Sequence, residues 1–379
     1  MKDFLGVHRN EAKTSNTNAS LDRLRFRIAA EAPLGFERYF VMDTATLNPV
    51  TQLYCTTHPS MGTEYSLYLY ASSREAAAAT AKPVFEEVDR VDALLSNYRP
   101  DSELSRINRE AFDYEVTTDP ETFRFLEMCL AWSKRSQGAF DISVGKLMKI
   151  WKFFGASGAL PTREEIAAAR EHVGWEKIRL DPAQRTVRFL SAEIELDPGG
   201  IGKGYAVDRA VRILRAKQIP AALLSAGSST IYALGAPPGE AGWKVRVPSA
   251  HPGDATISTV VLRDTSLSTA NLSEKNFVHE GQFYGAIMDP RTLQPVRGML
   301  QVTVISQFAT DSDALSNALF VLGPEDRASL LGEQDCALVI SEQRSENQVA
   351  PEYEAIRWPS EVTQRRLAEL PIAKEKEKL

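Results

Sequence analysis

The spacing of apolar residues predicts several helices and one clear pair of strands. Between residues 73 and 95 an alanine run and larger apolar residues recur at helical spacing, so this segment should form an amphipathic helix. The same spacing predicts helices over residues 119–137 and 162–172, and another that begins near Thr310–Asp311. Alternation around Met61-Gly62-Thr63 predicts two strands over residues 53–70.

Shorter apolar runs predict further strands, which we place at residues 177–180, 186–190, 221–224, 243–247, 256–263, 284–288 and 302–305. Helices and strands alternate irregularly and no repeat is present. The pattern therefore favours an α+β fold over a regular β-α-β series. We expect an N-terminal arm over residues 1–50, either mobile or folded, one domain over 51–345, and a C-terminal extension over 346–379 that ends in alternating charges.

Composition narrows the function classes. The chain of 379 residues carries a net charge of −6 without a basic stripe, which argues against nucleic acid as a partner. No apolar run approaches 18 residues, so we expect no membrane span. The N-terminus lacks the apolar core of a signal peptide, and Cys55 comes too late for a lipoprotein anchor. We expect a cytoplasmic location, with a periplasmic one as the alternative if a leader is missing.

The stretch Ile194–Leu214 has the strongest local chemistry. It predicts a short strand, Glu193–Leu196, then Asp197, a turn with four glycines, and a helix. Glycines allow close backbone approach, and the start of a helix favours anions. Lys203 adds a positive charge, so the stretch predicts a site for a phosphorylated ligand. It matches neither the P-loop nor the Rossmann pattern, because Gly204 and Tyr205 occupy positions where those motifs need other residues. A turn whose glycines serve only packing is the alternative.

Other constellations are weaker. The histidines form no HExxH motif, and Ser228 and Ser229 lie in AGSST instead of a nucleophile elbow, which argues against zinc and triad chemistry. Asp313 and Asn317 stand four residues apart and therefore side by side on a helix. Their oxygens suit Mg²⁺. The alternative for this pair is a solvated helix face.

Six segments, taken together and in order, resemble the FAD:protein FMN transferase (ApbE-like) family. The resemblance implies that this chain is a divergent member. The segments are Met61–Thr63, Ser96–Tyr98 with Ser102–Asn108, Gly138–Val144, Leu196–Asp208, Ala286–Pro295 and Asp313–Asn317. The resemblance covers roughly residues 55–340. It implies a two-lobed α+β domain with FAD between the lobes. It also implies a reaction in which a Thr or Ser hydroxyl of a target protein, an acceptor flavoprotein, attacks the FMN-side phosphorus of FAD and AMP leaves.

The resemblance also implies two sets of site residues. FAD would be held by Met61, Tyr98, Ala139, Phe140, Asp141, Asp197, Lys203 and Ile287. Magnesium would be held by the Gly200 carbonyl, Asp313 and Asn317.

Several positions depart from the family pattern. The family histidine, a candidate proton-transfer group, is Ala286 here, so no catalytic residue can be named. The metal-site threonine is Asn317, and a family glycine is Leu293. A Gly-Gly-Asp segment is Gly227–Ser229, and a Ser-Gly-x-Tyr segment is Thr269–Leu272. Two alternatives to transfer therefore remain: an FAD-binding protein without transfer activity, and an FAD pyrophosphatase that uses water. The sequence does not name the acceptor protein.

Overall fold

The computed structural model describes residues 25–28, 51–154, 158–249, 256–272, 276–345 and 348–362. Most of the expected N-terminal arm, and the charged tail from residue 363 onward, lie outside the described residues. Within the arm, β1 (Arg25–Ile28) pairs with the edge of the main sheet.

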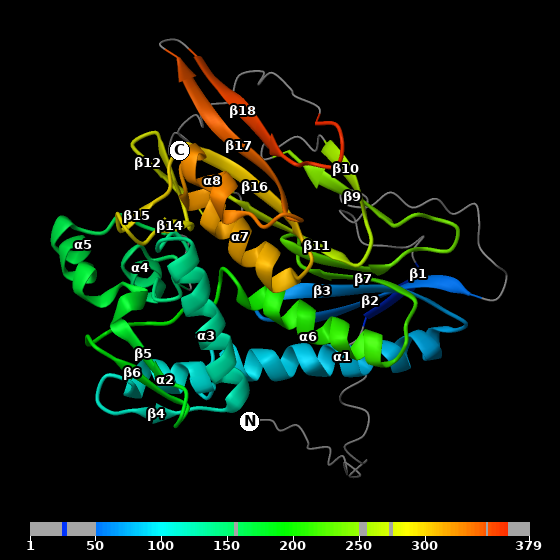
Figure 1. Ribbon diagram of the computed structural model, residues 1–379, viewed down its shortest axis with the longest axis horizontal. Helices are drawn as coiled ribbons and strands as arrows, with labels where there is room; N and C mark the ends of the chain where they lie inside the picture. Colours follow the sequence, from blue (N-terminus) through cyan, green and yellow to red (C-terminus); the bar gives the residue numbers. More distant parts are fainter. Residues whose placement is uncertain are drawn as a thin grey trace, which may run out of the picture.

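The main sheet has nine antiparallel strands and forms the larger lobe (Figure 1). Its order is β1-β2-β3-β7-β8-β11-β16-β17-β18. The strands after β1 are β2 (Gln52–Ser60), β3 (Thr63–Ala71), β7 (Ala221–Ala226), β8 (Thr230–Gly235), β11 (Thr265–Asn271), β16 (Met299–Ser306), β17 (Cys336–Ser345) and β18 (Gln348–Ile356). The sheet continues across the boundary expected at residue 345, because β18 pairs with β17 along its length.

The predicted strand pair is confirmed as the β2–β3 hairpin. Ser60 pairs with Thr63, which leaves Met61 and Gly62 as a two-residue loop. Both loop residues have positive φ, 50° and 70°, the requirement of a type I′ turn. A methionine in this conformation is uncommon, and the Tyr65 hydroxyl donates to its Sδ at 3.1 Å. The hairpin thus holds Met61 in a fixed orientation.

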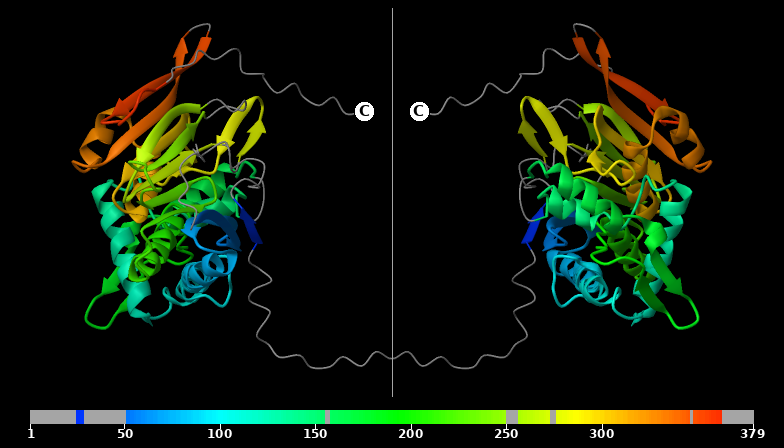
Figure 2. Two further views of the ribbon diagram at one scale, coloured as in Figure 1. Left: turned by 90° about the vertical axis from the view of Figure 1, so that its right-hand side faces the viewer. Right: turned by 90° about the vertical axis from the view of Figure 1, so that its left-hand side faces the viewer.

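Three long helices pack on one face of this sheet: α1 (Arg74–Leu95), α6 (Gly202–Ala216) and α7 (Ala309–Val321). They share one large core with the inward side chains of the sheet. The opposite face is covered by a two-stranded sheet of β9 (Trp243–Pro248) and β10 (Thr256–Leu262). The side views in Figure 2 show the orange and red β17–β18 hairpin extending away from the helices.

The smaller lobe is mostly helical. It contains α2 (Glu103–Glu110), α3 (Pro120–Arg135), α4 (Gly145–Ile150) and α5 (Arg163–Ala169), with 3₁₀ turns at Arg170–His172 and Trp175–Lys177. A three-stranded sheet completes it, with β4 (Val116–Thr117), β6 (Thr186–Phe189) and β5 (Ile178–Asp181) in that order. Thr162 forms a capping box with Glu165 at the start of α5, as its helix-start pattern predicts.

Smaller elements join the lobes and the sheet edge. They are β12 (Asn276–His279), β13 (Gln282–Gly285), β14 (Met288–Asp289), β15 (Gln294–Pro295) and α8 (Pro324–Leu330). The strand predicted at 284–288 is therefore wrong in extent, because it divides between β13 and β14. In α8, Arg327 is buried and its guanidinium contacts Glu354 of β18 at 3.0 Å. This ion pair ties the edge strand to the helices.

The strand predicted at Glu193–Leu196 is wrong. Only Glu195 forms a bridge, with Val144. The backbone of Leu196 bonds instead to the Asn108 side chain, which donates to its carbonyl at 3.1 Å and accepts from its N–H at 2.8 Å. A side chain of α2 thus occupies one edge of this segment. On the other edge, the Glu195 carbonyl accepts from the Gly145 N–H and the Asp197 N–H donates to the Ile142 carbonyl, which is too short a pairing to form a strand.

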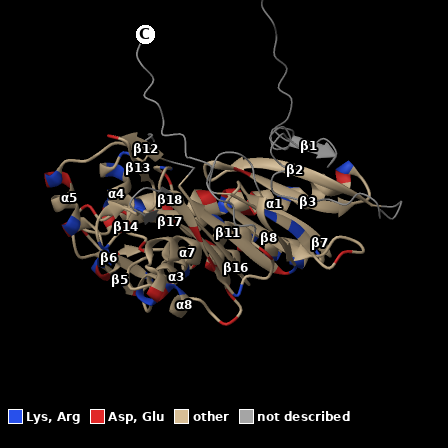
Figure 3. Ribbon diagram, turned by 90° about the horizontal axis from the view of Figure 1, so that it is seen from above, with Lys and Arg blue, Asp and Glu red and all other residues tan. Residues whose placement is uncertain are grey.

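Charges are dispersed over the molecule. Seen from above, Lys and Arg are interspersed with Asp and Glu (Figure 3). Within the described residues, none of the helices combines the length and the apolar composition that crossing a bilayer requires.

Candidate functional site

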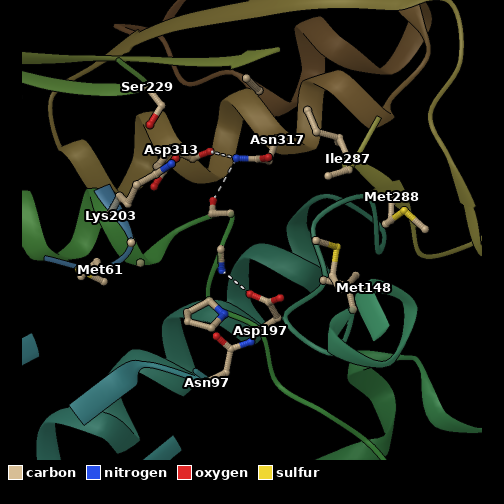
Figure 4. A pocket seen from close by; sticks show the side chains of 18 of the residues that line it. Met61, Asn97, Met148, Asp197, Lys203, Ser229, Ile287, Met288, Asp313 and Asn317 are labelled. Carbon is tan, nitrogen blue, oxygen red and sulfur yellow. Dashed lines mark hydrogen bonds between the residues drawn. The ribbon is translucent and has the colours of Figure 1, made fainter. Parts of the chain in front are cut away.

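A pocket of about 860 Å³ lies where the two lobes meet (Figure 4). It is lined by the β2–β3 turn, the loop after α1, the loop after α3, the start of α6, the end of β11 and one face of α7. All the residues that the sequence singled out for FAD and metal line this pocket, and so does Ala286. The set comes from segments that are far apart in the chain: Met61, Tyr98, Ala139, Phe140, Asp141, Asp197, Gly200, Lys203, Ala286, Ile287, Asp313 and Asn317.

The glycine-rich turn is shaped by its own aspartate. Asp197 is buried, and its Oδ1 accepts from the N–H of Gly199 at 2.8 Å. The chain then enters α6 at Gly202 without a side-chain cap. The N–H groups of Gly202 and Gly204 already donate to the Pro198 carbonyl and to the Asp313 carboxylate. This end of α6 therefore offers an anion the charge of Lys203, which lines the pocket, and the positive end of the helix dipole.

Asp313 lies opposite this helix start and is only 3% exposed. Its Oδ2 accepts from the N–H of Gly204 at 2.9 Å, and its Oδ1 accepts from the Ser268 hydroxyl at 3.3 Å. The solvated-face alternative is therefore wrong for Asp313. The burial arises because α7 is covered on several sides by the sheet and α6.

The starts of α6 and α7 are joined in both directions. Asp208 of α6 caps α7 by accepting from the N–H groups of Ala309 and Thr310, each at 2.9 Å. In return, Asp313 of α7 accepts from the first turn of α6. This contact needs a glycine, because a Cβ on Gly204 would stand 2.2 Å from the Ala309 carbonyl oxygen.

Asn317, the third residue expected to hold the metal, lies beside the other two, Gly200 and Asp313. Its Nδ2 donates to the Gly200 carbonyl at 3.3 Å and to the Asp313 carbonyl at 3.0 Å. Carboxylate, carbonyl and amide oxygens are a donor set that fits a hard cation. Among the described residues no group of three His, Cys, Asp or Glu side chains could hold a metal. A cation here would therefore depend on carbonyl, amide and ligand oxygens beside the single carboxylate.

The other wall of the pocket is more apolar. Tyr98 is 53% exposed and stacks on Phe154 with ring centroids 4.3 Å apart. Met61, Phe140 and Ile287 supply further apolar surface. A flat aromatic group would find hydrophobic contact on this side of the pocket, and an anionic group would find positive charge on the other side.

Asp141 lies in this wall and holds the loop after α3. Its carboxylate accepts from the N–H and hydroxyl of Ser143 and from the N–H of Trp175, all at 2.8 Å. Burial raises its pKa to about 6, and these hydrogen bonds oppose the rise. These three hydrogen bonds hold the carboxylate against the backbone of the loop after α3 and of the Trp175 turn.

No histidine lines the pocket among the described residues. His279 does not replace the one missing at Ala286, because it stands at the end of β12 with an exposed ring, 3.8 Å from Glu280. Sequence reasoning did not single out Asp92, which lines the pocket. Burial raises the pKa of Asp92, and Arg99 opposes the rise. Asp92 belongs to an ordinary polar helix face, so its position gave no signal.

Comparisons with known proteins identify the family of this chain. Residues 61–340 match the sequence profile of the ApbE family. The FAD:protein FMN transferase of Treponema pallidum is 31% identical over 279 residues, which cover 69% of this chain and 77% of the relative. A protein of the same name from Klebsiella pneumoniae is 29% identical over 278 residues, covering 73% of this chain and 84% of the relative.

Solved structures show the same architecture. The crystal structure of the ApbE protein from Thermotoga maritima superposes with a TM-score of 0.71 at 29% identity, covering 81% of this chain and 97% of that one. The flavin transferase ApbE from Vibrio cholerae gives a TM-score of 0.72 at 22% identity, covering 81% and 98%, and this likeness concerns the fold. The profile match over most of the chain, the relatives and the shared α+β fold lead to one conclusion: this chain belongs to the ApbE family.

Proposed function

We propose that this protein is a Mg²⁺-dependent FAD:protein FMN transferase. In this reaction a Thr or Ser hydroxyl of a target protein bonds to the FMN-side phosphorus of FAD, the pyrophosphate bond breaks, and AMP leaves. One observation carries the proposal. The residues that the family resemblance assigns to FAD and metal, from six separated segments, all line one pocket of about 860 Å³.

The two walls of the pocket suit the two parts of FAD. Lys203, at the start of α6, would hold the negatively charged pyrophosphate, together with the positive end of the helix dipole. The apolar wall, with Tyr98 and Ile287, would contact the isoalloxazine ring. Asp197 would contact the adenylate part.

Gly200, Asp313 and Asn317 would hold Mg²⁺, since the structure gathers them beside the start of α6. Mg²⁺ bound there would neutralise charge that develops on the pyrophosphate. The chain's own contribution is to fix the pyrophosphate between Lys203 and this group. Positioning and electrostatic stabilisation supply most of the rate in phosphoryl transfer.

A second candidate function follows from Ala286, which stands where the family has its candidate proton-transfer histidine. Ala286 cannot move a proton, and losing one general base costs about 10²–10⁴ in rate. Because no histidine lines the described pocket, an FAD-binding protein without transfer activity is the alternative favoured by this observation. An FAD pyrophosphatase, with water in place of the acceptor hydroxyl, uses the same binding residues.

One experiment separates these functions. The purified full chain is incubated with FAD and Mg²⁺, with and without a peptide that carries an acceptor threonine, and nucleotides are resolved by chromatography. FMN on the peptide together with AMP supports the transferase, whereas free FMN and AMP indicate a pyrophosphatase. Intact FAD that co-elutes with the protein indicates binding alone. FAD that neither binds nor changes contradicts the flavin assignment.

The metal assignment has its own test. Asp313→Ala should remove the Mg²⁺ dependence of FAD binding or cleavage, because this carboxylate is the only charged member of the proposed metal group. Asp311→Ala, the same change on the same helix at a residue that does not line the pocket, is the matched control. A Mg²⁺ dependence that persists in Asp313→Ala would place the metal elsewhere.

A further inference from the structure

The side-chain amide of Asn317 lies between two backbone carbonyls. Its Nδ2 donates to the Gly200 oxygen at 3.3 Å and to the Asp313 oxygen at 3.0 Å (Figure 4). Both neighbours are acceptors only. The NH₂ group of the amide must therefore face them, and its oxygen must point away.

The surroundings hold the amide in this orientation. A Cβ on Gly200 would stand 3.4 Å from Asn317 Cγ, so the amide packs directly against the Gly200 backbone. The carboxylate of Asp313 accepts from Gly204 and from Ser268. Each protein group of the proposed cation site is thus hydrogen-bonded within the protein.

An amide and a hydroxyl differ at this position in one respect. A hydroxyl carries its donor and its lone pairs on the same oxygen, whereas an amide separates them on nitrogen and oxygen. A threonine at 317 could donate to the carbonyl of Asp313, four residues earlier on the helix, and present a lone pair to a cation at the same time. Asparagine cannot, because its oxygen reaches the cation only after the amide turns by about half a revolution.

We infer that Asn317 closes the cation site of this chain: its NH₂ group occupies the side of Gly200 and Asp313 that a divalent cation would take. A cation binds only when the amide turns and gives up both N–H bonds. The affinity for divalent cations is therefore lower than that of the same protein with a hydroxyl residue at 317. This inference rests on the proposed function only in placing the cation at this group.

The experiment measures metal binding directly, without FAD and without turnover. Mn²⁺ is titrated into the full chain and free Mn²⁺ is followed by electron paramagnetic resonance. Asn317→Thr should bind Mn²⁺ about ten-fold more tightly than wild type, since the two N–H bonds that wild type gives up contribute modestly each. Asn317→Ser should shift the affinity in the same direction and serves if the threonine variant folds poorly. Asn97→Thr, on the other wall of the pocket, is the matched control and should keep the wild-type affinity.

The outcomes separate the inference from the proposed function. If the Thr and Ser variants bind Mn²⁺ no more tightly than wild type, while Asp313→Ala abolishes binding, the cation site stands and the closing role of Asn317 is overturned. If Asp313→Ala binds Mn²⁺ like wild type, or if neither wild type nor any variant binds it, the cation site itself is wrong and the inference falls with it. Tighter binding by both hydroxyl variants, lost again when Asp313→Ala is added, supports it.

Discussion

Gly204→Ala should both lower the free energy of unfolding and weaken FAD binding in the pocket. The added Cβ would stand 2.2 Å from the Ala309 carbonyl oxygen and 2.8 Å from the Cβ of Asp313, whereas ordinary contact begins near 3.4 Å. The obstacle is backbone, which cannot swing aside as a flexible side chain can. The starts of α6 and α7 must therefore separate by about 1 Å.

The magnitude follows from three contributions. Overpacking a tight contact costs about 1–3 kcal/mol. Weakening the hydrogen bond from the Gly204 N–H to the buried Asp313 carboxylate costs about 1.5–3 kcal/mol. Replacing glycine by alanine within a helix returns about 1 kcal/mol. We expect a net loss of about 3 kcal/mol in the free energy of unfolding, a large share of the stability of a typical domain.

The assay is urea unfolding followed by tryptophan fluorescence, together with FAD binding. Gly323→Ala is the matched control, because nothing lies within 4 Å of an added Cβ there. That variant should change stability by less than about 1 kcal/mol. If Gly204→Ala unfolds at the same urea concentration as Gly323→Ala and binds FAD like wild type, the close approach of the two helices is not what shapes the pocket.

Three further changes test other parts of the structure. Lys203→Ala should weaken FAD binding about ten-fold or more, because the pyrophosphate loses a charged partner. Lys217→Ala, at the exposed far end of α6, should leave FAD binding unchanged. Equal FAD affinities of these two variants would refute the anion site. Burial raises the pKa of Asp141 from 3.8 to about 6, so the folded protein holds the Asp141 proton more tightly than the unfolded chain does. The contribution of Asp141 to the free energy of unfolding therefore falls as pH rises from about 4 to 6, by at most about 3 kcal/mol. The difference in unfolding free energy between wild type and Asp141→Asn, measured across that range, should show this slope, and a flat difference would contradict it. Arg327→Met should lower the free energy of unfolding in urea by about 2–3 kcal/mol, because the buried guanidinium also donates to two backbone carbonyls near the end of α7. Glu354→Gln, which changes the partly exposed partner of Arg327, should lower it by less than about 1 kcal/mol. A larger loss in Glu354→Gln than in Arg327→Met would show that the carbonyl contacts contribute little.

Periodicity predicted the elements whose partners are nearby in the chain. The β2–β3 hairpin and the helix starting at Arg74 formed as expected, because alternation and helical spacing are local properties. The segment before Asp197 did not, because its backbone bonds to Asn108, 88 residues away. A strand pattern cannot reveal that a distant side chain will take the place of a neighbouring strand.

The sequence predicted only part of the pocket. The glycine-rich turn and Lys203 indicated an anion site by local chemistry. Gathering Met61, Tyr98 and Ile287 around it required the family resemblance, since no spacing rule links these positions. The burial of Asp313 was missed because helical spacing places it on a polar face, while α6 and the sheet enclose that face in the fold.

The reciprocal capping of α6 and α7 bears on when the pocket arises during folding. The contacts that join the two helix starts link residues 101 to 109 positions apart in the chain. Because closing loops of this length costs entropy before the contacts stabilise the chain, we expect these pairings to form late in folding. A partly folded chain therefore has neither helix start in place, and a ligand held between them recognises only the completed native state. Ligand binding then raises the unfolding free energy of the whole domain by mass action, so a saturating ligand should protect amides throughout the main sheet from hydrogen exchange.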